Sequence, residues 1–332
     1  MLLGFSSAVL TKIRILFLGR LKDKDFKKML NCNSFGEVVI YLKTSTVYSS
    51  VLSSLDETKF HCEYLESIFK KNLFDELAAL GKYDAKVSHH VFSYIFLKME
   101  VLGILKFLSF LKANQMENFE FYFPEFASGY IKINFKKMSE IKTYSDFLSV
   151  LKGSVYYKIM KKFDFKKTED IDLNKIETSI YSFFFENYIR DLSINLNKEI
   201  CNYNLSYLEI LNLKRVFRLK KNYDADNNYI LSLIYNIKGY NSKKIRNLIL
   251  SEDFDNELKK FKFYSENLDI DRLSIWFKFN WAKKNIFGSD SLPVVFLSYI
   301  FLKEIEIDNI VNVIEGKRYG LKTEEIEKII TR

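Results

Sequence analysis

The chain has 332 residues, of which 48% are hydrophobic and 28% are charged, and its formal net charge is +9. A chain of that length is too long for one small hydrophobic core, so we expect two or three domains. Its apolar residues are numerous enough to form their cores. The charge is moderate at this size, so it permits contact with an anionic partner but establishes none. Only two prolines and eleven glycines interrupt the chain, which favours long helices over short strands.

The N-terminal segment, residues 1–10, is apolar, but Lys12 and Arg14 follow the apolar run instead of preceding it. A secretory signal has the opposite order, so we expect a buried first helix. Two later windows, residues 90–111 and 293–314, are also apolar, yet both contain charged residues. Each charge would cost about 2.5–3.5 kcal/mol at the centre of a membrane span. Both windows are therefore predicted to be core helices.

Residue types that bind metals or form disulfides are few. Cys32, Cys62 and Cys201 are odd in number, far apart and without a CxxC pair, which predicts reduced structural thiols in a cytosolic protein. His89 and His90 are adjacent, and neighbouring helical residues point about 100° apart, so they do not share a metal on a helix. We expect no metal site and no cofactor.

The most informative feature of the sequence is an internal repeat. The hexapeptide Ser-Tyr-Ile-Phe-Leu-Lys occurs at residues 93–98 and again at residues 298–303. Similar segments start near residues 93, 206 and 298, which predicts three repeats of about one hundred residues.

A second shared segment aligns two of the copies residue by residue. Glu209 and Asn212 match Glu306 and Asn309 in a Glu-Ile-x-Asn pattern, whereas the first copy has Gly103 at the position of the asparagine. Apolar residues at helical spacing surround the pattern. We therefore predict an all-α protein with a pseudo-threefold repeat, in lobes formed by residues 1–115, 116–240 and 241–332.

The segment from Gly316 to Thr323 superficially resembles a phosphate-binding loop. A true loop of that kind has four residues between its glycines, a lysine directly after the second glycine, and a preceding strand. Here three residues separate Gly316 from Gly320, and Leu321 follows. We instead predict a helix end with a left-handed cap near Gly320 and a last helix that starts at Thr323. Motifs of hydrolases and dinucleotide-binding enzymes are also missing from the sequence, so no catalytic residue is predicted.

Residues 213–221 are the most basic helical segment. Lys214, Arg218 and Lys221 are spaced four and three residues apart, so they share one face of the predicted helix. Together with Arg215 they form a candidate partner-binding set. Basic residues interleaved with aromatics also fit nucleic acid or anionic lipid, and an ordinary solvated face is the alternative.

The C-terminal stretch carries a resemblance to a known family. Pro293 opens a helix that runs through Lys-Glu-Ile-Glu-Ile-Asp-Asn-Ile, continues into Gly316-Lys317 and Gly320-Leu, and is followed by a Glu-Glu-Ile segment. This order of motifs resembles the C subunits of the V/A-type rotary ATPases, an AC39-like family whose eukaryotic member is known as the d subunit. Weaker similarity covers the segment from Tyr41 to Tyr48 and the region after Ile176.

The chain departs from that family's pattern at three positions. Asp308, Val311 and Glu315 stand where relatives usually carry arginine. The middle copy keeps its basic residues, as Lys214, Arg215 and Arg218.

The resemblance implies a three-lobed helical funnel on the cytoplasmic face of a membrane rotor ring, which holds the foot of the central stalk. The implied partners are the coiled-coil stalk subunit with its small companion and the proteolipid subunits of the ring, with peripheral contact to the membrane complex. It implies torque transmission without nucleotide, cofactor or nucleic acid. The sequence does not determine the transported ion, whether the complex hydrolyses or synthesises ATP, or which lobe binds the stalk. The alternatives are a nucleic-acid-binding or regulatory module that uses residues 213–221, and an enzyme without a recognisable motif.

Overall fold

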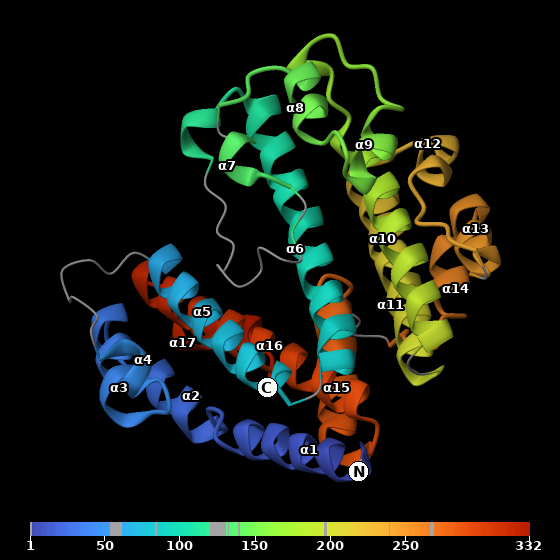
Figure 1. Cartoon of the computed structure of the whole chain (residues 1–332). Helices are drawn as coiled ribbons and strands as arrows, with labels where there is room; N and C mark the ends of the chain where they lie inside the picture. The colour runs from blue at the N-terminus through green and yellow to red at the C-terminus, as the bar shows by residue number, and fades with distance from the viewer. Residues whose placement is uncertain are drawn as a thin grey trace. The chain divides into compact units, whose positions relative to one another are not determined.

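The computed structural model describes residues 2–53, 62–83, 85–119, 131, 133–138, 140–195, 198–238, 240–265 and 269–332. All regular secondary structure in these ranges is helical (Figure 1), which confirms the predicted all-α class. Within the same ranges, no helix combines the length and the apolar character that crossing a membrane requires. The chain divides into two compact units, one formed by residues 1–91 and 275–332 and the other by residues 92–274.

The first unit brings both ends of the chain together around α16 (Leu292–Arg318). It also contains α1 (Leu2–Leu18), α2 (Asp23–Leu30), α3 (Phe35–Ser45), α4 (Ser49–Leu52), α5 (Cys62–Gly81), α17 (Thr323–Ile329), most of α15 (Leu273–Gly288) and the start of α6 (Ala85–Ala113). Helix α16 packs against α1, α3, α5 and α17. It is buried along most of its length, and the buried residues include the charged Lys303 and Glu306. The predicted core helix at residues 293–314 is thus confirmed.

Local sequence explains how this unit's helices begin and which face they bury. Pro293 lies in the first turn of α16, where its missing N–H costs no hydrogen bond. In α1, Val9, Ile13 and Phe17 are four residues apart and all buried, whereas Leu18 is 60% exposed. The expected first helix therefore forms and buries one stripe.

The second unit is built on the long helices α6, α10 (Leu173–Asn195) and α11 (Lys198–Phe217). The shorter helices are α7 (Phe135–Met138), α8 (Tyr144–Val150), α9 (Val155–Met160), α12 (Asn227–Ser232), α13 (Lys243–Leu250) and α14 (Phe254–Leu258), with η1 (Met116–Asn118), η3 (Thr168–Asp170) and the π-helical η4 (Arg218–Asn222). Helices α10 and α11 run side by side (Figure 1), and α11 also packs on α13. Leu213 and Val216 of α11 share a core cluster with Ile230 and Leu248.

The two units do not follow the three predicted lobes. The predicted boundaries near residues 115 and 240 both fall inside the second unit, and the first unit combines the two ends of the chain. The threefold division and the funnel therefore stay predictions drawn from the sequence repeat and the family resemblance.

Candidate functional site

The asparagines of the repeat make the same contact in both units. Asn309 on α16 donates from Nδ2 to the carbonyl oxygen of Thr331 (2.6 Å), and its Oδ1 accepts from the Thr331 N–H (2.8 Å). Asn212 on α11 does the same with Tyr235, at 2.9 and 2.8 Å. Both amides are buried. The contacted residue follows 22 residues after Asn309 and 23 residues after Asn212. Each amide thus holds the chain where it returns to the helix.

Glu306, three residues before Asn309, lies in a buried polar cluster. Its Oε1 accepts from the hydroxyl of Tyr48 (2.6 Å) and from Nζ of Lys303 (3.2 Å), and its Oε2 accepts from the N–H of Leu21 (2.9 Å). Nζ of Lys303 also donates to the Tyr48 oxygen at 3.0 Å. Burial, and then the neighbouring Glu306 carboxylate, raise the pKa of Tyr48 well above its ordinary value, so the phenol stays protonated. The cluster joins α16 to the α1–α2 loop and to the start of α4.

The glutamates of the three predicted copies differ in their surroundings. Glu100 in the first copy is buried, and its Oε2 accepts from the hydroxyl of Tyr156 at 3.1 Å. Glu209 in the middle copy is only half-buried. The pairing of a glutamate with a tyrosine hydroxyl therefore occurs in the first and third copies.

Arg215 carries the buried charge of the middle copy. Its guanidinium is 2.8 Å from Glu177, donates to Thr178 Oγ1 at 2.6 Å and to the Leu233 carbonyl oxygen at 2.8 Å, and lies 4.2 Å from the ring centroid of Tyr235. The Arg215 side chain is 6% exposed, so the structure uses it inside the second unit.

The other basic residues of this segment lie nearer the surface. Lys214 donates to the carbonyl oxygen of Asp271 at 2.5 Å, and Lys221 pairs with Asp255 at 3.1 Å. Burial lowers the pKa of Lys214. Arg218 is exposed and lies with Lys221 in the π-helical turn that follows α11. Partner binding by this set stays a prediction, and Arg218 and Lys221 are its exposed members.

The glycines near the C-terminus shape the end of α16. Gly320 has a φ of +69°, and its N–H donates to the Lys317 carbonyl while the Leu321 N–H donates to the Gly316 carbonyl. This pair of bonds is the Schellman arrangement, and α17 begins at Thr323. The predicted left-handed cap and last helix are confirmed.

Gly316 and Lys317 serve the same helix end in different ways. A Cβ on Gly316 would lie 2.5 Å from a side-chain carbon of Ile326, so glycine allows α17 to pack closely on α16. Lys317 places a positive charge in the last turn of α16, where it favours the helix dipole.

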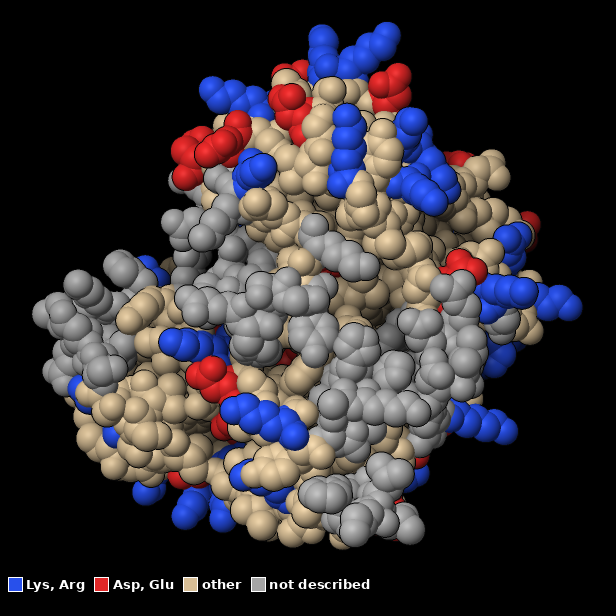
Figure 2. All heavy atoms as spheres, in the orientation of Figure 1, with Lys and Arg blue, Asp and Glu red and all other residues tan. Residues whose placement is uncertain are grey.

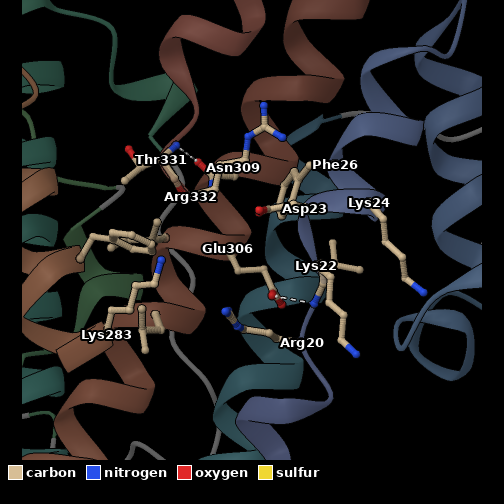
Figure 3. A pocket seen from close by; sticks show the side chains of 14 residues that line it. Arg20, Lys22, Asp23, Lys24, Phe26, Lys283, Glu306, Asn309, Thr331 and Arg332 are labelled. Carbon is tan, nitrogen blue, oxygen red and sulfur yellow. Dashed lines mark hydrogen bonds between the residues drawn. The ribbon is translucent and has the colours of Figure 1, made fainter. Parts of the chain in front are cut away.

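A pocket of about 410 Å³ lies in the first unit beside Glu306 and Asn309 (Figure 3). Its basic lining residues are Arg20, Lys22, Lys24, Lys283 and Arg332, and its acidic ones are Asp23 and Glu306. The lining comes from the α1–α2 loop with the start of α2, from α15, from α16 and from the last residues of the chain. Because these residues are far apart in sequence, no local motif predicted the pocket.

The described residues contain no metal-binding cluster and no disulfide. Groups of three or more His, Cys, Asp or Glu in metal-binding proximity are missing from that part of the chain, and the side chains of His89 and His90 lie outside it. Cys32, Cys62 and Cys201 form no disulfide, and burial raises the pKa of all three thiols.

Asn212, Asn309 and Glu306 thus hold helices to one another and to the returning chain. The protein is therefore of the all-α class, with helices joined by buried polar contacts. A sequence profile described as ATP synthase (C/AC39) subunit matches residues 9–329. The chain is also 23% identical over 339 residues to the C subunit of the A-type ATP synthase of Archaeoglobus fulgidus, covering 96% of this chain and 94% of that protein. The chain belongs to the ATP synthase C/AC39 subunit family, as the C-terminal motifs predicted.

Proposed function

We propose that this chain is a non-catalytic rotor subunit of a V/A-type ATPase, which joins the central stalk to the membrane rotor ring. It transmits torque for ATP-driven ion transport or for ATP synthesis. The observation that carries the proposal is the family match over residues 9–329, because it accounts for nearly the whole chain.

The packing of both units supports a mechanical role. A subunit that transmits torque needs elements that do not slide under load. Close-packed cores give low compressibility, and satisfied buried polar networks hold helices in a single register. Asn212, Asn309 and the Glu306 cluster are contacts of this kind.

The proposed partners are the coiled-coil stalk subunit with its small companion and the proteolipid ring. In this role the chain is a peripheral protein on the cytoplasmic face of the membrane complex, and it needs no nucleotide and no cofactor.

A nucleic-acid-binding module is the less supported alternative. It depends on residues 213–221, but Arg215 is buried in an internal ion pair and Lys221 pairs with Asp255. On the face shown in Figure 2, Lys and Arg side chains are spread out and mixed with acidic ones instead of gathered in one stripe. Backbone-directed nucleic-acid binding relies on a clustered basic surface.

The test is a pull-down from membranes solubilised in mild detergent, repeated between 50 and 200 mM salt. We expect the stalk and ring subunits to be retained, because protein interfaces with an apolar core lose only part of their affinity with salt. Nucleic-acid binding through several phosphates would instead weaken roughly a thousandfold over that range.

Charge reversal separates the two functions further. The variant carries Lys214→Glu, Arg218→Glu and Lys221→Glu, and its matched control carries Lys243→Glu, Lys244→Glu and Arg246→Glu on the exposed face of α13. Capture of nucleic acid alone, lost with salt and with the first variant only, would show that the coupling function is wrong.

A further inference from the structure

The loop between α1 and α2 contributes to the lining of two hollows in the first unit. Their volumes are about 410 and 400 Å³, and both are lined by Arg20, Leu21, Lys22 and Lys24. We call the two hollows together the α1–α2 groove.

The groove has more basic than acidic side chains in its lining. Lys22, Lys24 and Lys283 are exposed. Figure 3 shows Lys22 extending away from the loop and Lys24 extending away from the first turn of α2. Of the three acidic lining residues, Glu306 is already held by Tyr48, Lys303 and Leu21. The half-buried Asp25 accepts from the Tyr41 hydroxyl and the Lys22 N–H. Asp23 alone is an exposed carboxylate. The groove therefore presents an excess of positive charge.

Among the basic residues that line the groove, Arg20 has a guanidinium whose N–H donors are available to a bound anion. Its guanidinium is half-buried and lies 4.1 Å from the ring centroid of Phe17. Among the described residues it has no hydrogen-bond or ion-pair partner. Burial lowers the pKa of Arg20, against the opposing effect of Glu306 and Asp23. A guanidinium has five N–H donors and matches a carboxylate in a two-point contact.

The backbone of the loop is not available to an anion. The Leu21 N–H donates to Glu306 at 2.9 Å, and the Lys22 N–H donates to Asp25 at 2.8 Å. Phosphate sites usually rely on such free backbone N–H groups. Recognition in the groove therefore depends on side chains distributed over both hollows.

Apolar surface accompanies the charges. The half-buried Phe279 and the buried Phe26, Leu302 and Ile305 line one hollow. Leu18, 60% exposed, and Val47, 50% exposed, line the other. Apolar contacts between spaced cations fit a peptide with alternating acidic and apolar side chains better than they fit a small inorganic anion.

We propose that the α1–α2 groove binds an acidic segment of a partner protein. Carboxylates of the segment pair with Arg20, Lys22, Lys24 and Lys283, and its apolar side chains pack against the walls of both hollows. The proposal goes beyond the coupling function, since it concerns the chemistry of the bound segment and holds for whichever protein carries it.

The experiment measures fluorescence anisotropy of a labelled twelve-residue peptide of Glu-Glu-Leu repeats with the purified full chain at 50 mM salt. The matched peptide has Gln in place of Glu. We expect binding of the acidic peptide only, and weakening of about tenfold or more in the variant Lys22→Gln, Lys24→Gln, Lys283→Gln. The control variant Lys238→Gln, Lys243→Gln, Lys244→Gln also loses three exposed lysines, and its affinity should stay within about twofold of wild type.

Arg20→Gln gives an independent second reading, and it should also weaken the peptide. If this change lowers thermal stability, the triple lysine variant decides, because its three side chains are exposed. Equal losses in the groove and control variants, or an absence of peptide binding by the wild type, would overturn the proposal. So would displacement of the peptide by millimolar inorganic phosphate, or tighter binding of a single-stranded RNA of twelve nucleotides at the same residues.

Discussion

The surroundings of Asn212 and Asn309 differ, although both residues stand in the same Glu-Ile-x-Asn sequence pattern. Both asparagines hold a returning chain segment by the same pair of hydrogen bonds. Around Asn309, the buried charges lie before it on α16, at Lys303 and Glu306. Around Asn212, the buried charge lies after it on α11, at Arg215. The amide contact is therefore common to both copies, whereas the buried ion pair belongs to each copy separately.

The comparison indicates that the asparagine, and not the ion pair, is the part of the motif that fixes the returning chain to the helix. An amide can satisfy a backbone N–H and C=O together, which few other side chains can do. A buried ion pair can be placed elsewhere, because its main requirement is a partner of opposite charge and full hydrogen bonding. This predicts that matched substitutions in the two copies will have equal effects at the asparagines and unequal effects at the glutamates.

The largest expected effect is at Glu306. Glu306→Ala leaves Lys303 buried without its counter-charge and removes the acceptor of Tyr48, so we expect a loss of about 3–5 kcal/mol in the free energy of unfolding. Glu209→Ala removes a half-buried side chain and should cost at most about 0.5 kcal/mol. Urea denaturation followed by circular dichroism measures both. Equal losses would contradict the distinction between the copies.

The asparagines should behave alike. Asn309→Ala and Asn212→Ala each remove two buried hydrogen bonds and leave one backbone N–H and one C=O without a partner, at an expected cost of about 2–3 kcal/mol. The amide protons of Thr331 and Tyr235 should also exchange faster with solvent in the matching variant. The two losses should agree within about 1 kcal/mol, and a large effect at one asparagine only would break the proposed equivalence.

The end of α16 should be sensitive to a single methyl group. Gly316→Ala places its Cβ against Ile326, so we expect a loss of about 1–3 kcal/mol from overpacking. Gly36→Ala in α3 meets only ordinary contact with Ser34 and should be neutral or stabilising by up to about 1 kcal/mol. Thermal melts of both variants test this, and a tolerated Gly316→Ala would mean that α17 moves freely on α16.

The smallest expected effect is a dependence on alkaline pH. Burial raises the pKa of Tyr41 to about 12 and that of Tyr48 well above its ordinary value. An unfolded tyrosine loses its proton near about pH 10, so above that pH the folded state holds more protons and the unfolding free energy falls as pH rises. Tyr48→Phe should make the decline between pH 9 and 11 less steep, while the other tyrosines with a raised pKa keep part of it. Tyr223→Phe, at a 70% exposed position, should leave the slope unchanged. An identical slope in both variants would contradict this assignment.

Local features of the fold were predictable from the sequence, whereas its long-range contacts were not. The left-handed Gly320 and the correspondence of Asn212 with Asn309 follow from turn chemistry and repeat spacing, which act over a few residues. Tyr48 and Glu306 are 258 residues apart, so no helical periodicity could join them.

Helical spacing alone could have predicted that one residue of the basic segment, Arg215, is buried. Arg215 follows Asn212 by three residues, so it lies on the buried side of α11 with that asparagine, whereas its neighbour Lys214 points about 100° away. The groove at Arg20 and Lys283 gave no comparable signal, because its lining assembles from four separate parts of the chain.

The most direct test of the coupling function is ATP-driven ion uptake by membrane vesicles depleted of this chain and then supplied with it. We expect depleted vesicles to lose uptake while the released catalytic head still hydrolyses ATP. Purified chain should restore uptake and saturate at a fixed ratio to the ring. Uptake that continues at full rate in the depleted vesicles, with the head still bound to the ring, would contradict the proposal that this chain joins the stalk to the rotor.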